Sequence, residues 1–212
     1  MYINIKNLSK KIKNIEVLHS INLEFNSGNV YGLSGKNGSG KTMLMRSICG
    51  LIMPTSGEIN INGEILHKDI SFPRSLGALI EAPSFLPNLT GSENLELLAS
   101  IKKIINKEDI KKILLSVGLN PNDNKIFKKY SLGMKQKLGI AYAFMENPDI
   151  IILDEPLNAL DENSVILVKN LIELHKKRDA IIIIACHDKN ELQSLSNSII
   201  KIENGCIIYE KN

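Results

Sequence analysis

The sequence predicts an α/β protein that combines a mostly parallel β-sheet with an antiparallel β-subdomain at the N-terminus and an inserted α-helical subdomain. Three observations point to this fold class. Short runs of alternating apolar and polar residues occupy about the first 65 positions, as in half-buried strands. From about residue 89 to residue 145 the apolar positions recur with helical spacing. After that, continuous β-branched runs alternate with helices, which is typical of a parallel sheet covered on both faces.

The predicted elements follow one another along the chain. Runs such as YINIK, EVLHSINLEF and GEINING, separated by Asn, Gly and Ser, predict strands joined by turns. YGLSG predicts a short strand that leads into a glycine-rich loop, and MLMRSICGLI predicts the helix after it. LTGSENLELLASIKKII opens on a capping box between Thr90 and Glu93. DIIILDEP and AIIIIAC then predict buried strands, followed by helices from about Glu162 to Lys177 and from about Lys189.

We expect residues 1–212 to form a single domain in which residues 83–148 are the inserted helical subdomain. No Pro-rich or Gly/Ser-rich linker separates the two parts. Residues 83–148 hold ten Lys against six Asp or Glu. These lysines fit a surface near lipid headgroups or a solvated helical face, and we favour the solvated face.

Composition and charge argue against several classes of protein. The chain is 43% hydrophobic and 23% charged, as folded globular proteins are. No apolar run approaches the roughly 18 residues that cross a bilayer, and the N-terminus lacks the apolar core of a signal peptide, so we expect a cytosolic location. The net charge is only +3, with 23 Lys, three Arg and no Trp, which disfavours a nucleic-acid partner. Three scattered cysteines predict reduced core residues.

Residues 35–42, GKNGSGKT, match the P-loop spacing G-x-x-x-x-G-K-[ST] and lie between a predicted strand and a predicted helix. The glycines permit backbone turns that point N–H groups at phosphate oxygens, and the helix N-terminus adds its partial positive charge. Lys41 is expected to contact the β- and γ-phosphates, and Thr42 to coordinate Mg²⁺. The predicted nucleotide-binding residues here are Gly35, Lys36, Asn37, Gly38, Ser39, Gly40, Lys41 and Thr42.

DIIILDEP places two carboxylates at the end of a predicted central strand. Asp154 is expected to hold Mg²⁺ through water, and Glu155 to polarise a water in line with the γ-phosphate. Glu155 therefore predicts nucleotide hydrolysis in addition to binding. A GTPase or a P-loop kinase lacks support, because the sequence has no Arg-rich lid and no phosphate-acceptor motif.

A second helix N-terminus with phosphate-binding character follows at residues 130–137, YSLGMKQK. With this motif in place, the chain resembles the ATP-binding-cassette (ABC) family over essentially its whole length. The family signature, LSGGQ followed by a basic residue, Gln and another basic residue, corresponds to YSLGM and KQK. The resemblance implies a RecA-like P-loop NTPase core that binds and hydrolyses ATP with Mg²⁺. It also marks NALD, residues 158–161, as the D-loop, with Asp161 coupling a dimer, and His187 as the switch histidine.

In the ABC family two cassettes pack head to tail, and each ATP lies between the P-loop of one subunit and the signature helix of the other. The resemblance therefore implies that Ser131, Gly133 and Met134 bind a nucleotide held by a partner subunit, in a homodimer or in a heterodimer with another ABC ATPase. The helix dipole would reinforce these contacts. The resemblance also implies a separate multi-span membrane permease, which would hold the chain at the inner face of the membrane.

Three departures from the family pattern are informative. Glu81 stands where the family has the Q-loop glutamine, and a carboxylate there can ligate Mg²⁺ but cannot donate a hydrogen bond. Glu81 and the SLGM signature resemble the branch that exports or resists peptide antibiotics, including lantibiotic immunity and bacitracin resistance, although a tolerated polar swap is an alternative for Glu81. Ile12 replaces the aromatic residue that stacks on adenine, which predicts weak discrimination between ATP and GTP. Leu132 replaces the first signature glycine.

These observations predict an ATPase subunit that powers a separate permease for the export of, or immunity to, a peptide antibiotic or bacteriocin. The alternative is a soluble ABC ATPase that serves cofactor assembly, repair or cell division. The expected catalytic residues are Glu155, His187 and Glu81. The expected metal ligands are Thr42, Asp154 and Glu81.

Overall fold

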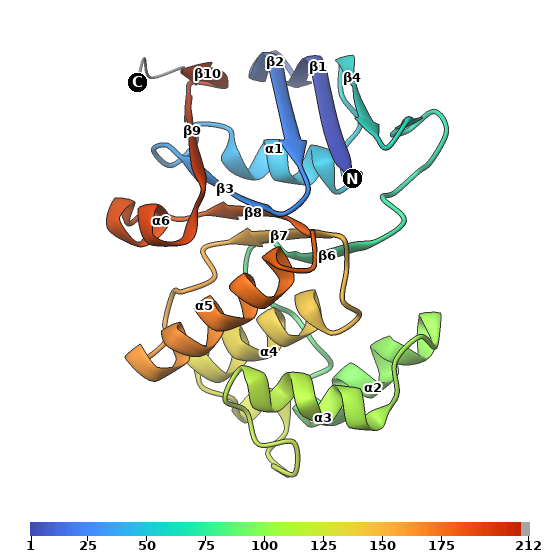
Figure 1. The fold of residues 1–212 in the computed structure, drawn as a ribbon, viewed down its shortest axis with the longest axis vertical. Coiled ribbons are helices and arrows are strands. Elements are labelled where there is room, and N and C mark those ends of the chain that lie inside the picture. Colours follow the sequence, from blue (N-terminus) through green and yellow to red (C-terminus); the bar gives the residue numbers. More distant parts are fainter. Residues whose placement is uncertain (209–212) are drawn as a thin grey trace.

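Two β-sheets organise the protein in the computed structural model, which describes residues 1–208 (Figure 1). The first sheet has the strand order β2-β1-β4-β5 and antiparallel pairing throughout. Its strands are β1 (Tyr2–Ile12), β2 (Ile15–Asn26), β4 (Ser56–Ile61) and β5 (Glu64–Ile65). This is the predicted N-terminal antiparallel layer.

The second sheet has the order β10-β9-β3-β8-β7-β6 and is parallel except for the pair β9 and β10. Its strands are β3 (Asn29–Ser34), β6 (Leu76–Leu79), β7 (Ile150–Asp154), β8 (Ile181–Ala185), β9 (Ser198–Glu203) and β10 (Cys206–Ile208). The predicted α/β fold class with a mostly parallel sheet is confirmed. Every residue of β8 and all but the last of β7 are buried, which explains their unbroken runs of β-branched residues.

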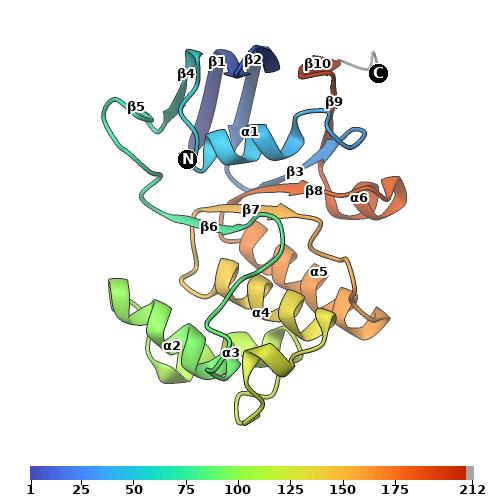
Figure 2. The ribbon, with the colours of Figure 1, turned by 180° about the vertical axis from the view of Figure 1, so that it is seen from behind.

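The helices cover both faces of the parallel sheet (Figures 1 and 2). They are α1 (Lys41–Ile48), α2 (Gly91–Lys102), α3 (Lys107–Ser116), α4 (Leu132–Phe144), α5 (Glu162–Lys176), α6 (Lys189–Leu195) and a 3-10 turn at Phe127–Lys129. Helix α1 lies between the two sheets, whereas α4 and α5 lie on the opposite face and α2 and α3 lie outside them. The hydrophobic core accordingly has two parts, one around α1 and one around α4 and α5.

Most helix boundaries agree with the predictions, and one does not. The capping box is present, because Thr90 accepts a hydrogen bond from the Glu93 N–H and the Glu93 carboxylate accepts one from the Thr90 N–H. The helix predicted from MLMRSICGLI is too long, since α1 ends at Ile48 and Gly50 adopts a φ of 77°. A glycine in the left-handed region ends a helix there.

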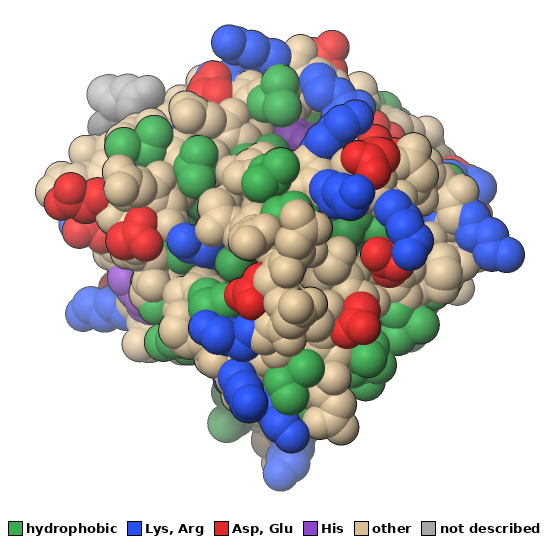
Figure 3. Space-filling view, turned by 90° about the horizontal axis from the view of Figure 1, so that it is seen from below, with side chains coloured by type: hydrophobic (Ala, Val, Ile, Leu, Met, Phe, Trp, Pro, Cys, Tyr) green, Lys and Arg blue, Asp and Glu red, His purple; other side chains and the backbone are tan. Residues whose placement is uncertain are grey.

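Helices α2, α3 and α4 all lie between β6 and β7 in the chain, within the segment predicted to be an inserted subdomain. None of the helices in residues 1–208 has both the length and the apolar character that crossing a membrane requires. Seen from below, basic side chains are spread over the surface with acidic and apolar side chains between them (Figure 3). Several lysines of this segment are paired, for example Lys102 with Glu146 and Lys107 with Glu96, each at 2.8 Å. This distribution favours a solvated face over a patch for lipid headgroups.

His175 is a buried titratable group in the last turn of α5. Its ring packs edge-on against Phe144 with 4.8 Å between ring centroids, and its Nδ1 has no hydrogen-bond partner among the described residues. Burial, with a smaller contribution from Arg178, lowers the pKa of His175 from 6.5 to about 4. Between these two values the unfolded chain binds a proton that the folded chain does not, so stability falls as the pH drops.

We expect His175→Leu to remove this part of the acid sensitivity. After allowance for solvent screening near the helix end, the wild-type protein should lose roughly 1 kcal/mol of unfolding free energy between about pH 7.5 and pH 5 because of His175. Urea unfolding at the two pH values measures the difference. His19→Gln, at a half-exposed histidine, is the control and should keep the wild-type pH dependence. An unchanged pH dependence in His175→Leu would contradict this account.

Candidate nucleotide-binding site

A cavity of about 660 Å³ opens where the carboxyl ends of β3, β6, β7 and β8 meet. The predicted site residues that line it are Asn37, Gly38, Ser39, Gly40, Lys41, Thr42, Glu81, Asp154, Glu155 and His187. The predicted residues that do not line it are Gly35, Lys36, Ser131, Gly133, Met134 and Asp161. Val17 and Gln136, for which the sequence predicts no role, also line the cavity.

The P-loop connects β3 to α1, and its shape depends on glycine. At Gly35 a Cβ atom would lie 2.2 Å from the carbonyl oxygen of Ile202, so no other residue fits there. Gly40 precedes α1 at a φ of 111° and provides no side chain to cap the helix. The first N–H groups of α1 are therefore left without side-chain partners, as a phosphate-binding helix N-terminus requires.

Two buried side chains of the P-loop, Lys41 and Ser39, can bind an anionic ligand. Lys41 is only 6% exposed, and its ammonium donates hydrogen bonds to the carbonyl oxygens of Gly35 (2.7 Å) and Lys36 (3.2 Å). Ser39 is equally buried, and its hydroxyl has no hydrogen-bond partner among the described residues. A buried hydroxyl without a partner is costly, and a phosphate oxygen would satisfy it. These residues fit the phosphates of ATP.

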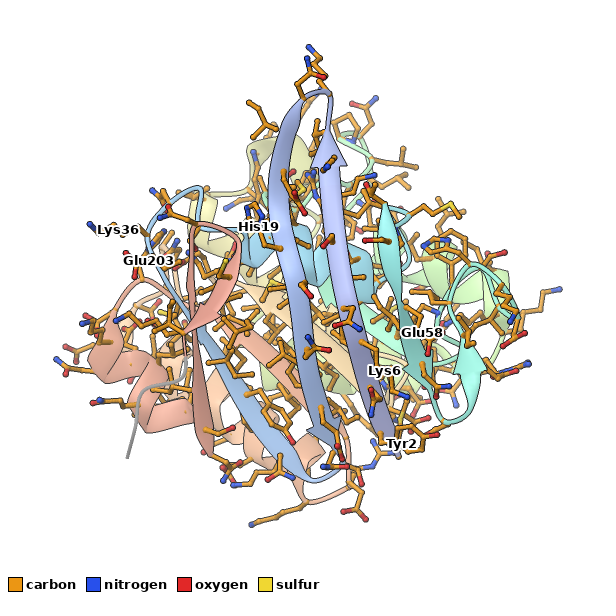
Figure 4. All side chains as sticks on the ribbon, turned by 90° about the horizontal axis from the view of Figure 1, so that it is seen from above. Tyr2, Lys6, His19, Lys36, Glu58 and Glu203 are labelled. Atoms are coloured by element: carbon orange, nitrogen blue, oxygen red, sulfur yellow. The ribbon has the colours of Figure 1, made fainter. Side chains whose placement is uncertain are left out.

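The turn between β9 and β10 contacts the P-loop, and the sequence did not predict this contact. Figure 4 shows this turn beside the P-loop, with Lys36 and Glu203 labelled. Gly205 donates its N–H to the carbonyl oxygen of Ser39 and accepts from the N–H of His19, both at 2.9 Å. The Asn-Gly pair in IENGC signals a tight hairpin, but nothing in the sequence indicates what the hairpin contacts.

Thr42 and Asp154 meet across the cavity floor. The Thr42 hydroxyl donates to Asp154 Oδ2 at 3.0 Å, although the two residues are 112 positions apart. A hydroxyl and a carboxylate are the hard oxygen ligands that Mg²⁺ prefers. Residues 1–208 contain no cluster of three or more His, Cys, Asp or Glu that could hold a metal by itself. The donor set therefore fits Mg²⁺, which takes its other ligands from phosphate and water.

Glu155 and His187 form the second polar pair of the cavity. The distance from Glu155 Oε1 to His187 Nε2 is 3.3 Å, but it lacks hydrogen-bond geometry, so Oε1 has no hydrogen bond within the described residues. Burial raises the pKa of the Glu155 carboxyl, and His187 partly opposes this shift. A carboxylate with a raised pKa and a free oxygen is suited to orient and deprotonate a water.

Glu81 follows β6 and lines the same cavity in a left-handed backbone conformation, with a φ of 63°. Its Oε1 accepts a hydrogen bond from the Arg46 guanidinium at 2.6 Å. Ile12, at the end of β1, also lines the cavity, as does Val17, and is 42% exposed. The structure thus gives an aliphatic surface at the position predicted to contact the base.

The signature residues lie at the start of α4. Ser131 is the N-cap, and its Oγ accepts a hydrogen bond from the Met134 N–H at 3.2 Å. A Cβ on Gly133 would come within 2.7 Å of the Ala159 carbonyl oxygen, so glycine is needed there. Asp161 caps α5 through Ser164, which donates to it from its N–H and its hydroxyl.

Gln136 ties α4 to the residues that follow β7 in the same chain. Its side chain is buried and donates to the carbonyl oxygens of Glu155 (2.9 Å) and Pro156 (3.2 Å). Glu155 itself has a φ of 51°, which is unfavourable for a residue with a side chain. Gln136 is therefore positioned to hold Glu155 in this strained conformation.

The fold and the site define a P-loop nucleoside-triphosphate hydrolase, and comparison with known proteins narrows this class. A family model described as ABC transporter matches residues 18–158. The uncharacterized ABC transporter ATP-binding protein YybJ of Bacillus subtilis is 47% identical, over 99% of both chains. The bacitracin transport ATP-binding protein BcrA of Enterococcus faecalis is 37% identical, over 99% of this chain and 69% of its own. The lantibiotic transport ATP-binding protein SrtF of Streptococcus pyogenes is 35% identical, over 99% and 90%.

Solved structures agree with these relatives. A dimeric ATP-binding cassette in a post-hydrolysis state with ADP and Pi superposes with a TM-score of 0.88 and 25% identity, covering 99% of this chain and 98% of that one. The chain belongs to the ABC transporter family, as an ATP-binding ATPase subunit. The predicted family and the predicted ATPase activity are confirmed.

We expect Gln136→Met to lower kcat for ATP hydrolysis by about tenfold, while the affinity for ATP changes little. Methionine has a similar length but cannot donate to the Glu155 and Pro156 carbonyl oxygens, so Glu155 loses its support. Steady-state hydrolysis and equilibrium binding of a fluorescent ATP analogue measure the two quantities. Gln193→Met, at an exposed glutamine of α6, is the matched control. A wild-type kcat in Gln136→Met would contradict the positioning role.

Proposed function

We propose that this chain hydrolyses ATP to power a separate multi-span membrane permease that exports, or gives immunity to, peptide antibiotics. The observation that carries the catalytic part is the convergence of the P-loop, the Thr42–Asp154 contact and the Glu155–His187 pair on one cavity. In this proposal the permease holds the chain at the inner face of the membrane.

The site residues take the following roles. The P-loop N–H groups and Lys41 bind the β- and γ-phosphates, and Thr42 and Asp154 provide oxygen atoms for the metal. Mg²⁺ neutralises negative charge that develops on the phosphates when it is bound with ATP. Glu155 orients a water and accepts its proton, and His187 stabilises the site from the end of β8.

A second copy, or a different ABC ATPase, completes each site in this proposal. Ser131 is exposed at the N-terminus of α4, and because its oxygen accepts the Met134 N–H, its hydroxyl proton remains free to donate to a phosphate. Gly133 adds a backbone N–H without a side chain, and the helix dipole favours an anion at this end. The dimeric cassette among the structural neighbours supports this arrangement. Asp161 would couple the two subunits.

We expect Glu155→Gln to form a stable dimer in saturating Mg-ATP, because a site that cannot hydrolyse ATP keeps the γ-phosphate contacts that join the subunits. Light scattering coupled to size exclusion should show twice the monomer mass. Adding Ser131→Arg to Glu155→Gln should restore the monomer, since a long side chain blocks the helix N-terminus. The shared-site arrangement fails if Glu155→Gln stays monomeric both alone and beside a sister cassette.

We further propose that the cargo of the permease is a peptide antibiotic. Bacitracin and lantibiotic transport ATP-binding proteins are 37% and 35% identical to this chain over nearly its whole length. Glu81 in the cavity and the SLGM signature are the local features that agree with this branch.

We expect cells that express this chain with its permease to tolerate a several-fold higher concentration of bacitracin or of a lantibiotic than cells without them. Glu155→Gln should abolish the protection at equal protein level, because transport requires hydrolysis. Inhibitory concentrations and membrane fractionation are the measurements. Protection that survives Glu155→Gln, or a chain found only in the cytosol when the permease is present, would favour a soluble ABC ATPase.

A further inference from the structure

The ion pair between Arg46 and Glu81 links the P-loop helix to the loop after β6. Arg46 lies on α1 four residues after Thr42, so both side chains project from the same face of the helix. Thr42 contacts Asp154 at 3.0 Å, and one turn further along Arg46 contacts Glu81 at 2.6 Å. Glu81, Thr42 and Asp154 all line the same cavity, so the Glu81 carboxylate faces the space that also holds the oxygen atoms that fit Mg²⁺.

This ion pair adds little to the stability of the fold. The Glu81 side chain is 62% exposed and that of Arg46 is 30% exposed, and ion pairs as open to solvent as this one contribute little to stability. The left-handed backbone of Glu81 is itself unfavourable for a residue with a Cβ atom. Because the ion pair is weak and Glu81 is strained, another cation in the cavity can easily replace Arg46 as the partner of Glu81.

The loop that carries Glu81 is anchored on both sides. It is anchored before Glu81 by β6, which pairs with β7 up to Leu79. It is anchored after Glu81 at Leu86, whose N–H donates to Asn94 Oδ1 at 2.9 Å and whose carbonyl accepts from Asn94 Nδ2 at 3.2 Å. Asn94 is buried in α2, so this anchor is firm. Between the two anchors, Glu81 contacts Arg46 and lines the cavity that also contains Thr42.

We propose that Arg46 is a positioning residue that holds Glu81 away from the metal site and thereby sets the Mg²⁺ concentration at which the ATP site fills. In this proposal Mg²⁺ and Arg46 compete for the Glu81 carboxylate, so Glu81 joins Thr42 and Asp154 as a metal ligand only when the Arg46–Glu81 pair opens. This inference rests on the proposed function, because it needs ATP and Mg²⁺ in the same cavity. A glutamine at position 81 would form only a weaker, neutral contact with Arg46, so the competition depends on the carboxylate of this chain.

Metal affinity measured in a double-mutant cycle tests the proposal. The proteins are the wild type, Arg46→Gln, Glu81→Ala and the double variant, each with a saturating non-hydrolysable ATP analogue. The probe is Mn²⁺, whose free concentration is read by electron paramagnetic resonance. Arg46→Gln should lower the apparent Kd for Mn²⁺ by about three- to fivefold, and Glu81→Ala should raise it. In the Glu81→Ala background, Arg46→Gln should have no effect.

Two further variants control for folding and for charge. Arg46→Lys keeps the charge but loses the planar fork, and should give a smaller shift in the same direction. Arg74→Gln removes an arginine that pairs with Glu64 at the surface and should leave the Kd for Mn²⁺ unchanged. Thermal melts establish that each variant is folded.

The possible outcomes distinguish failure of this inference from failure of the proposed function. Equal effects of Arg46→Gln in the wild-type and Glu81→Ala backgrounds would show that the charge of Arg46 affects metal binding without Glu81. No effect of Arg46→Gln, or weaker Mn²⁺ binding, would show that Arg46 does not compete with the metal for Glu81. Each of these results overturns the proposal. Nucleotide binding is also measured at saturating Mg²⁺ with a fluorescent ATP analogue. Absence of nucleotide binding by the wild type under these conditions would overturn the proposed function and this inference with it. Normal nucleotide binding without coupling would overturn the inference alone.

Discussion

The burial of α1 between the two β-sheets is the constraint on which the nucleotide site depends. Leu44, Met45 and Ile48 are fully buried, and they fix the helix against the antiparallel sheet on one side and the parallel sheet on the other. Close packing leaves the N-terminus of α1 little freedom to move. Lys41 and Thr42 are consequently held at the ends of β7 and β8, where Asp154 and His187 emerge. The antiparallel sheet thus contributes to the site mainly by holding α1 in place.

Three residues with an unfavourable backbone conformation line the cavity that this packing creates. Glu81, Glu155 and Ala159 all have positive φ angles between 51° and 63°, and all three line the cavity. Conformations of this kind cost roughly 1 kcal/mol or more each and persist only where neighbouring groups enforce them. Gln136 supports Glu155 through its hydrogen bonds, and Arg46 holds the Glu81 side chain. Two of the three strained residues are thus held by side chains from neighbouring helices.

The parts of the site that could be predicted from the sequence are those fixed by local chemistry or by the geometry of parallel sheets. The P-loop has a complete motif, and the meeting of Thr42 with Asp154 follows because carboxyl ends of parallel strands share one edge. The support of the P-loop by Gly205 could not be predicted, since it is a contact between two backbones that many sequences could make. The Arg46–Glu81 pair joins residues 35 positions apart through a loop whose conformation no local pattern specifies. The end of α1 at Ile48, by contrast, could have been predicted from the sequence, because glycine, here Gly50, commonly follows the last turn of a helix.

The arrangement of α4 explains how two shared sites would act together in the proposed dimer. Ser131 and Gly133 do not line the chain's own cavity, although Leu132 between them does. Gln136, about one turn further on, binds the backbone of the chain's own Glu155. A helix of this length moves as a nearly rigid unit, so a phosphate contact at its N-terminus also affects the hydrogen bonds one turn away. A nucleotide held by the partner subunit would then bias the position of Glu155 in this chain. Since the partner's α4 would act in the same way on the partner's own glutamate, the two hydrolysis sites would be coupled through two short helical segments.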